Sequence, residues 1–236
     1  MLEPTKVFSN LRVWHDQTPR TGAENMAVDQ LLMESCLDVP ILRIYRWSEP
    51  TVSFGYFNTL QEATASFPST SDENLHYVRR WTGGGVVDHR VDVTYTLAIP
   101  RNQVIAQARG AESYRVIHQA LADVLGEIGE IAQLTRVCGG DGGVQCFSNP
   151  VAYDLTDPSG GKVAGAGQRR SRYGLLHQGS VVPKSKLHEL SDALTCLLPV
   201  RLAERHDAYL SEPELLGGVA QLAQSRYASR EWLEKR

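Results

Sequence analysis

The sequence Arg79-Arg80-Trp81-Thr82-Gly83-Gly84-Gly85-Val86-Val87-Asp88-His89-Arg90 is the most informative stretch of this chain. Its three consecutive glycines follow a short run typical of a strand, Leu75-His76-Tyr77-Val78. Because glycine carries no side chain, the backbone there can lie flat against a ligand. The two arginines at its edge add permanent positive charge and fork-shaped donors. We expect a ligand with a carboxylate, an acyl carbonyl or a phosphate, although a glycine-rich hairpin between surface arginines has the same pattern.

A second glycine-rich stretch surrounds a lysine, in the sequence Gly160-Gly161-Lys162-Val163-Ala164-Gly165-Ala166-Gly167. A lysine on a largely apolar strand, among small residues, would be partly desolvated and close to backbone. Such an ammonium can donate hydrogen bonds to an acyl carbonyl or to a phosphate. We therefore predict that this stretch forms the second wall of the same site. A surface lysine at a hairpin tip is the alternative.

The composition is that of an ordinary globular protein. Hydrophobic residues make up 42% and charged residues 22% of the 236 residues, and no convincing linker divides them, so residues 1–236 are interpreted as a single domain. The net charge of -3 and the pI near 6.2 argue against binding of nucleic acid through bulk charge. No apolar run approaches the roughly 18 residues of a membrane span. No signal peptide is apparent, and we expect a cytoplasmic chain.

The four cysteines are too few and too scattered for a disulfide framework, and none forms a CxxC pair, so no metal site is expected. Cys36 and Cys196 lie in apolar helical contexts and are predicted to pack in the core. Cys146 follows the glycine-rich loop 139–143. Beside a lysine and arginines its thiolate could be favoured, as a nucleophile requires, whereas a buried small apolar residue is the alternative.

The periodicity of apolar residues predicts an α+β fold, with a mixed or antiparallel sheet covered by helices. Thr21 and Glu24 form a capping-box pattern in front of a helix that ends before Pro40. Further helices are predicted at 111–128, 187–198, 212–224 and 229–235. Strands are predicted at 11–14, 41–47, 51–56, 75–78, 91–99, 151–155, 162–167 and 175–182.

Four further residues carry candidate functional groups. His89 and His177 could each act as a base or a positioning donor, although a lone histidine on a strand is more often structural. The pair Tyr153-Asp154 could hold a ligand amide or close a turn. Taken singly, these signals are weak.

In order along the chain, the same signals resemble the lipoate–protein ligase A and octanoyltransferase family, which has the biotin/lipoyl protein ligase fold. The resemblance spans nearly the whole chain. The matching segments are Glu24-Asn25-Met26-Ala27-Val28-Asp29, Arg43-Ile44-Tyr45-Arg46-Trp47, Val52-Ser53-Phe54-Gly55-Tyr56-Phe57-Asn58, Arg79–Gly85 with His89, Cys146-Phe147, Tyr153-Asp154, Lys162-Val163-Ala164-Gly165, Gln168-Arg169-Arg170, His177-Gln178-Gly179-Ser180 and Arg226-Tyr227-Ala228-Ser229-Arg230-Glu231-Trp232.

The resemblance implies that the glycine segment walls an acyl pocket and that Lys162 meets the acyl carbonyl. Cys146-Phe147 before Tyr153-Asp154 matches octanoyltransferases that pass the acyl group through a cysteine thioester, which implies that Cys146 and Lys162 are catalytic. The substrate-binding residues implied are Arg79, Arg80, Thr82, Gly83, Gly84, Gly85, His89, Tyr153, Asp154, Gly165, Ala166, His177 and Gly179.

Two positions depart from the family pattern: Arg90 stands where an acidic or amide residue is usual, and Asn58 replaces a glutamine. Arg90 adds positive charge that suits an acidic carrier protein or an adenylate. Ligases of the family often carry an accessory domain after the catalytic one, and this chain ends soon after it, so transfer is favoured over ligation.

The implied activity is transfer of an octanoyl or lipoyl group to a lysine of a lipoyl carrier domain, without a cofactor. The implied partners are acyl carrier protein and a carrier domain of a dehydrogenase E2 subunit or a glycine-cleavage H-type protein, and a monomer is expected. An ATP-dependent lipoate–protein ligase, with ATP and Mg as cofactors, is the alternative. A binding module that kept the fold without the activity is a third reading.

Overall fold

The computed structural model describes residues 6–36, 38–68, 74–135, 152–182, 184, 187–209 and 213–235. In these ranges the chain forms a mixed sheet of eight strands in the order β11-β1-β2-β6-β10-β9-β8-β7. The strands are β1 (Phe8–Arg20), β2 (Ile41–Trp47), β6 (Val93–Pro100), β7 (Gln133–Leu134), β8 (Leu155–Thr156), β9 (Lys162–Arg170), β10 (Gly174–Val181) and β11 (Ala203–Ala208). The predicted fold class is therefore confirmed.

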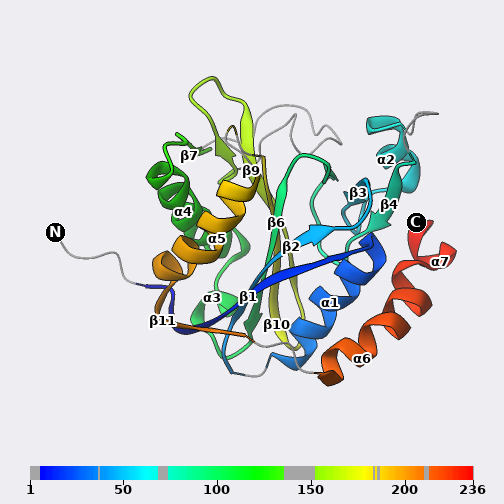
Figure 1. Cartoon of the computed structure of the whole chain (residues 1–236), viewed down its shortest axis with the longest axis horizontal. Coiled ribbons are helices and arrows are strands. Elements are labelled where there is room, and N and C mark those ends of the chain that lie inside the picture. The colour runs from blue at the N-terminus through cyan, green and yellow to red at the C-terminus, as the bar shows by residue number, and fades with distance from the viewer. Residues whose placement is uncertain are drawn as a thin grey trace.

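Helices cover both faces of this sheet (Figure 1). One hydrophobic core holds side chains of α4 (Gly110–Glu127) and α5 (Leu187–Leu202) against one face, with the short α3 (Val104–Gln107) beside them. A second core holds side chains of α1 (Gly22–Ser35) and α6 (Pro213–Leu222) against the other face. The sheet is thus the middle layer of three, and its buried strands are correspondingly apolar.

A smaller sheet stands beside the large one, in the order β4-β3-β5. It consists of β3 (Thr51–Phe54), β4 (His76–Arg79) and β5 (Val86–Asp88), with α2 (Leu60–Ser66) packed nearby. Strand β3 pairs in parallel with β4 and antiparallel with β5. The glycine segment, defined as residues 80–85, therefore connects β4 to β5 and passes over β3.

Local sequence signals explain where several elements begin. Thr21 caps α1: its hydroxyl accepts a hydrogen bond from the Glu24 backbone, and the Glu24 carboxylate accepts one from the Thr21 backbone. The capping box predicted from the sequence is confirmed. Strand β2 spans the predicted residues 41–47 because branched and aromatic side chains continue through it.

The C-terminal third differs from the prediction. Residues 203–208 form strand β11, which pairs in parallel with β1 at the sheet edge. Helix α5 continues through Pro199 to Leu202, and α6 is followed by a π-helical turn, η1 (Ala223–Tyr227), and by α7 (Arg230–Leu233). Helix α2 was also not predicted. The elements that differ from the prediction are short, or they lie where the apolar periodicity alone would extend a helix.

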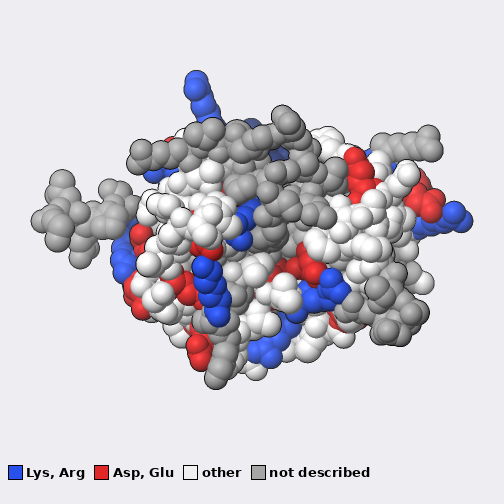
Figure 2. All heavy atoms as spheres, turned by 90° about the horizontal axis from the view of Figure 1, so that it is seen from above, with Lys and Arg blue, Asp and Glu red and all other residues white. Residues whose placement is uncertain are grey.

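Of the two cysteines predicted to pack in the core, Cys36 is buried and Cys196 is exposed. The prediction for Cys196 was wrong because the buried apolar face of α5 contains Leu194 and Leu198, two residues to either side of it. None of the helices in the described ranges is long and apolar enough to cross a membrane. Basic and acidic side chains are interspersed on the face seen in Figure 2.

Candidate functional site

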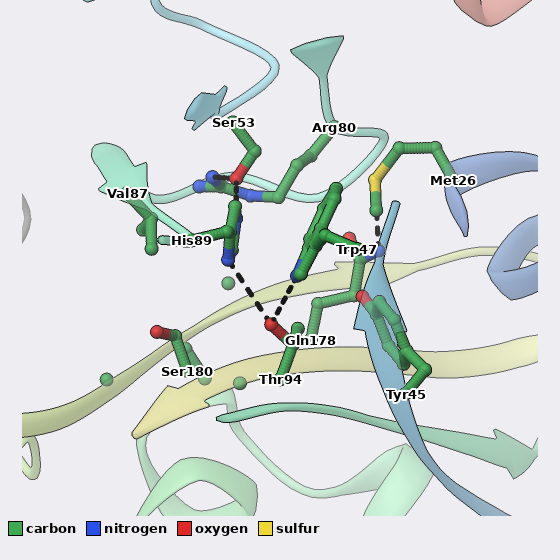
Figure 3. A pocket seen from close by; sticks show the side chains of 14 residues that line it. Met26, Tyr45, Trp47, Ser53, Arg80, Val87, His89, Thr94, Gln178 and Ser180 are labelled. Carbon is green, nitrogen blue, oxygen red and sulfur yellow. Dashed lines mark hydrogen bonds between the residues drawn. The ribbon is translucent and has the colours of Figure 1, made fainter. Parts of the chain in front are cut away.

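A narrow cavity lies where the large sheet faces the small one (Figure 3). Its free volume of about 20 Å³ is close to that of a single water molecule. Both apolar and polar side chains line it, and glycine backbone forms part of its wall. The lining residues are Met26, Tyr45, Trp47, Ser53, Arg80, Val87, His89, Thr94, Gly165, Ala166, Gly167, Gln178, Gly179 and Ser180.

The two glycine-rich stretches lie against each other, as the sequence predicted. A Cβ atom added to Gly167 would lie 2.2 Å from the carbonyl oxygen of Gly83, and one added to Gly55 would lie 2.0 Å from that of Gly84. Gly84 itself has a φ of 97°, in the left-handed region that glycine adopts without strain. Only glycine backbone permits this approach of the glycine segment to β9.

The ammonium of Lys162 is buried at this crossing. Its Nζ lies 2.6 Å from Oδ2 of Asp154, and both side chains are almost completely shielded from solvent. A Cβ at Gly165 would lie 2.6 Å from the same Nζ, so the ammonium occupies the space beside a residue that lines the cavity. Lys162 is therefore not a surface lysine at a hairpin tip, and that alternative is wrong.

A tyrosine on α4 fixes the carboxylate that holds Lys162. The hydroxyl of Tyr114 donates to Oδ1 of Asp154 and accepts a hydrogen bond of 2.7 Å from the backbone N–H of Ala166. Tyr114 thus joins the helix layer to the lysine strand, and the carboxylate and ammonium are held in one geometry.

The opposite wall of the cavity contains a chain of hydrogen bonds between Ser53, His89 and Asp92. Oγ of Ser53 lies 2.6 Å from Nε2 of His89, and Nδ1 of His89 lies 2.8 Å from Oδ2 of Asp92. Nη1 of Arg80 donates to the same Ser53 oxygen over 2.7 Å. Trp47 stacks on the His89 ring with centroids 4.0 Å apart.

A family model described as the lipoyl protein ligase A/B catalytic domain matches residues 21–205. The chain belongs to this family. Octanoyltransferase LipM of Carboxydothermus hydrogenoformans is 35% identical over 181 residues, which make up 74% of this chain and 66% of that protein. The matched region spans slightly less than two thirds of the length of this and similar curated relatives.

Solved structures of the family have the same fold. Lipoate-protein ligase A bound with ATP superposes with a TM-score of 0.70 at 20% identity, over 95% of this chain and 98% of that one. The bi-partite lipoate protein ligase of Thermoplasma acidophilum, studied with its E2 lipoyl domain, gives a TM-score of 0.69 at 18% identity, over 97% and 98% of the two chains. At these identities the likeness shows the shared fold of the family.

Several residues that the family resemblance named come together at the cavity. Arg80, His89, Gly165, Ala166 and Gly179 line it. Thr82 lies just behind the wall, where its hydroxyl donates to Oε1 of Gln178 over 2.7 Å. Gly85 contributes its carbonyl oxygen to Arg80 Nη2 at 2.8 Å.

Arg79 does not face the cavity, which corrects the expectation of a ligand contact. Its buried guanidinium donates instead to backbone carbonyl oxygens in two separate segments, one after β3 and one at the C-terminal end of the described chain. A buried guanidinium needs such partners for all its N–H groups, and here they fasten α7 to the small sheet. The carbonyls belong to Tyr56, Asn58, Trp232, Leu233 and Lys235.

His177 is buried, and it is absent from the cavity lining. One ring nitrogen lies 3.1 Å from the hydroxyl of Tyr95 and the other 3.0 Å from Nε2 of Gln168. Burial lowers the pKa of His177 well below its ordinary value, so the ring is neutral at neutral pH. The expected ligand contact is thus replaced by hydrogen bonds that connect β6, β9 and β10.

Tyr153 has a φ of 70°, and its carbonyl oxygen lies 2.7 Å from Nδ1 of the buried His118. This strained residue turns the chain so that Asp154 points at Lys162.

Cys146, the predicted nucleophile, lies outside the described residues. In the described ranges, no group of three or more His, Cys, Asp or Glu side chains is placed to hold a metal ion.

Sequence reasoning missed Ser53, Asp92 and Tyr114 as site residues. Ser53 lies in a segment that matches the family without a distinctive neighbour, and Asp92 lies in the range 91–99 that the sequence predicts as a strand. The available signal was the spacing of three between His89 and Asp92, which places a carboxylate within reach of the imidazole once the chain turns between β5 and β6.

Proposed function

We propose that this chain is a protein acyltransferase of lipoate metabolism, which moves an octanoyl or lipoyl group onto a lysine of a lipoyl carrier domain through a thioester on Cys146. The observation that carries the proposal is the buried ammonium of Lys162 beside Gly165 in the cavity wall. Family membership and 35% identity to an octanoyltransferase support the same activity.

Two acyl exchanges make up the proposed reaction. The thiolate of Cys146 attacks the carbonyl carbon of an acyl thioester, and the carrier thiolate leaves as the new thioester forms. The amine of the acceptor lysine then attacks the acyl-enzyme, loses a proton, and releases the Cys146 thiol as the amide forms. In both steps negative charge develops on the carbonyl oxygen, where the Lys162 ammonium can stabilise it.

The acyl chain is proposed to occupy the cavity, whose apolar contacts come from Met26, Tyr45, Trp47 and Val87. The free volume of about 20 Å³ is too small for eight carbons, so side chains must move when the chain enters. Met26 is suited to this because an unbranched thioether changes rotamer at low cost. Because the acyl donor is an octanoyl thioester and the acceptor is a carrier lysine, the expected partners are acyl carrier protein and a lipoyl domain. No cofactor is expected.

Intact-mass spectrometry tests the proposal. Incubation with octanoyl-acyl carrier protein should add one octanoyl group to the enzyme, and a lipoyl domain should then remove it and gain the same mass. Cys146→Ser should abolish both steps, whereas the exposed Cys196 provides a matched control in Cys196→Ser. Transfer by Cys146→Ser at the normal rate would eliminate the thioester mechanism.

A second candidate, an ATP-dependent lipoate–protein ligase using ATP and Mg, is favoured by a cluster of cations next to the glycine segment. The guanidinium carbon of Arg169 lies 4.5 Å from the Trp81 ring centre, and that of Arg226 lies 5.7 Å from it. The Lys235 ammonium lies 4.8 Å from the Tyr56 ring centre. Among the described residues none of these cations has a carboxylate within ion-pair distance, an arrangement that suits phosphate.

Pyrophosphate release separates the two candidates. A ligase supplied with lipoate, ATP and Mg should release pyrophosphate and form lipoyl-AMP, with weaker ATP binding in Arg226→Gln. Absence of pyrophosphate in a preparation that transfers octanoyl groups from acyl carrier protein would reject the ligase.

A further inference from the structure

The Ser53 hydroxyl has the surroundings of an activated nucleophile. It lines the cavity, and Figure 3 shows it between Arg80 and His89. Its oxygen lies 2.6 Å from Nε2 of His89, a distance at which the imidazole can take the hydroxyl proton. Nothing in the proposed transfer through Cys146 uses this serine.

Asp92 fixes the imidazole in the tautomer that such a proton transfer requires. Its Oδ2 lies 2.8 Å from Nδ1 of His89, so Nδ1 carries the proton and Nε2 presents its lone pair to Ser53. The Asp92 side chain is completely buried, and the hydroxyls of Thr94 and Ser180 also donate to its Oδ2. These hydrogen bonds hold the carboxylate in one position.

Two neighbours complete the arrangement. Trp47 stacks on the His89 ring at an interplanar angle of 21°, which prevents the ring from turning. Nη1 of Arg80 lies 2.7 Å from Oγ of Ser53, so a positive charge is already in place where an alkoxide, and later an oxyanion, would form. The nucleophile Ser53, the base His89 and the orienting carboxylate of Asp92 have the order and the distances of the catalytic triad of a serine hydrolase.

We propose that Ser53, His89 and Asp92 form a second nucleophilic site, which hydrolyses esters and thioesters of medium-chain fatty acids. The preference for the acyl chain rests on the proposed function, since the chain would occupy the same cavity. The assignment of the triad itself rests on the geometry of the three side chains.

The reaction balances with water as the second substrate. Oγ of Ser53 bonds to the acyl carbonyl carbon while its proton passes to Nε2 of His89, and the alcohol or thiol leaves with that proton. Water then attacks the acyl-serine, gives a proton to His89, and the fatty acid leaves as Ser53 recovers its hydrogen. The sum is one ester or thioester plus one water giving one acid and one alcohol or thiol.

The experiment uses full-length protein carrying Cys146→Ala, so that any acyl-enzyme must form elsewhere. An alkyl fluorophosphonate should label it once, with the label on the peptide containing Ser53, and p-nitrophenyl octanoate should be hydrolysed. Ser53→Ala should remove the label, and His89→Gln should lower hydrolysis at least about 100-fold. Ser191→Ala is the control, because Ser191 is also a buried serine and lies on α5.

The outcomes separate the two proposals. Labelling and hydrolysis that persist in Ser53→Ala, or their absence from the Cys146→Ala protein while its thermal unfolding is unchanged, would overturn the serine site. If the label reaches Ser53 but the unmodified enzyme never acylates a lipoyl domain, the transferase proposal fails and the serine site stands. Because Ser53→Ala could disturb β3, Ser53→Thr provides a second variant. It keeps the hydroxyl, and it should retain measurable labelling.

Discussion

The ammonium of Lys162 lies 2.6 Å from Oδ2 of Asp154, and both side chains are buried. A buried ion pair costs desolvation energy that its mutual attraction barely repays, so it is rarely retained for stability alone. Here the carboxylate is fixed by Tyr114, and the ammonium stands beside Gly165 at the cavity wall. The arrangement delivers a positive charge to a defined point of the cavity.

Removal of one partner should destabilise the fold more than removal of both. We expect Asp154→Asn to lower the free energy of unfolding by about 3–5 kcal/mol, because the buried ammonium loses its counter-charge. Urea denaturation measures the loss. The double variant Lys162→Met/Asp154→Leu should recover most of that stability while remaining inactive in acyl transfer. A double variant less stable than both single variants would contradict this account of the pair.

Substitution of Gly167 by alanine should separate the glycine segment from β9. The new Cβ would lie 2.2 Å from the Gly83 carbonyl oxygen, a contact that only backbone displacement relieves. We expect loss of acyl transfer and a lower melting temperature. Gly217→Ala on α6 is the matched control, since no atom lies within 4 Å of its added Cβ, and it should stabilise the helix by about 0.5–1 kcal/mol. Equal activity of Gly167→Ala and wild type would show that the close approach is dispensable.

The sequence predicted the elements whose signals are local. The capping box at Thr21 and the branched residues of β2 each report on neighbouring positions, and both predictions were confirmed. Strand β11 has the sequence Ala203-Glu204-Arg205-His206-Asp207-Ala208, without apolar alternation, because only its backbone is used at the sheet edge. Such a strand is stabilised by its backbone pairing with β1, so its sequence shows no alternation of apolar residues.

The sequence predicted which segments form the walls of the site, but not which side chains contact one another there. Glycine spacing indicated where backbone could approach a ligand, and the touching of Gly83 and Gly167 follows from it. The destinations of long side chains depend on tertiary packing. The prediction for Arg79 was therefore wrong: Arg79 ends β4 and donates to backbone carbonyl oxygens near the C-terminal end of the described chain, whereas Arg80 begins the glycine segment and lines the cavity.

Arg79→Met should release the C-terminal segment from the small sheet. The guanidinium donates to the carbonyl oxygens of Trp232, Leu233 and Lys235, and the substitution removes one buried and two partly buried hydrogen bonds. We expect a destabilisation of about 3 kcal/mol or more and faster proteolytic cleavage beyond η1. Arg230→Met on α7 should change neither, because that side chain is 86% exposed and its guanidinium donates to Glu234, a residue of the same segment. Unaltered proteolysis of Arg79→Met would show that Arg79 does not hold α7 to the small sheet.

His118 should make the fold sensitive to acid. Burial lowers the pKa of His118 from 6.5 to about 4, and its Nε2 has no hydrogen-bond partner among the described residues. The unfolded chain therefore binds a proton here below pH 6.5, whereas the folded chain binds it only below about pH 4. Since the unfolded state holds more protons in that window, stability falls as the pH falls, by up to about 3 kcal/mol at this residue.

The pH dependence can be assigned to His118 by substitution. Urea denaturation at intervals between pH 7 and pH 4 should show a slope that is shallower in His118→Gln than in the wild type, because glutamine does not titrate. The amide of the variant can still donate to the Tyr153 carbonyl oxygen, which limits the structural change. His206→Gln, at an exposed position, should leave the slope as it is. A slope unchanged in His118→Gln would assign the acid sensitivity elsewhere, and the buried His177, whose pKa burial also lowers, is then the next residue to substitute.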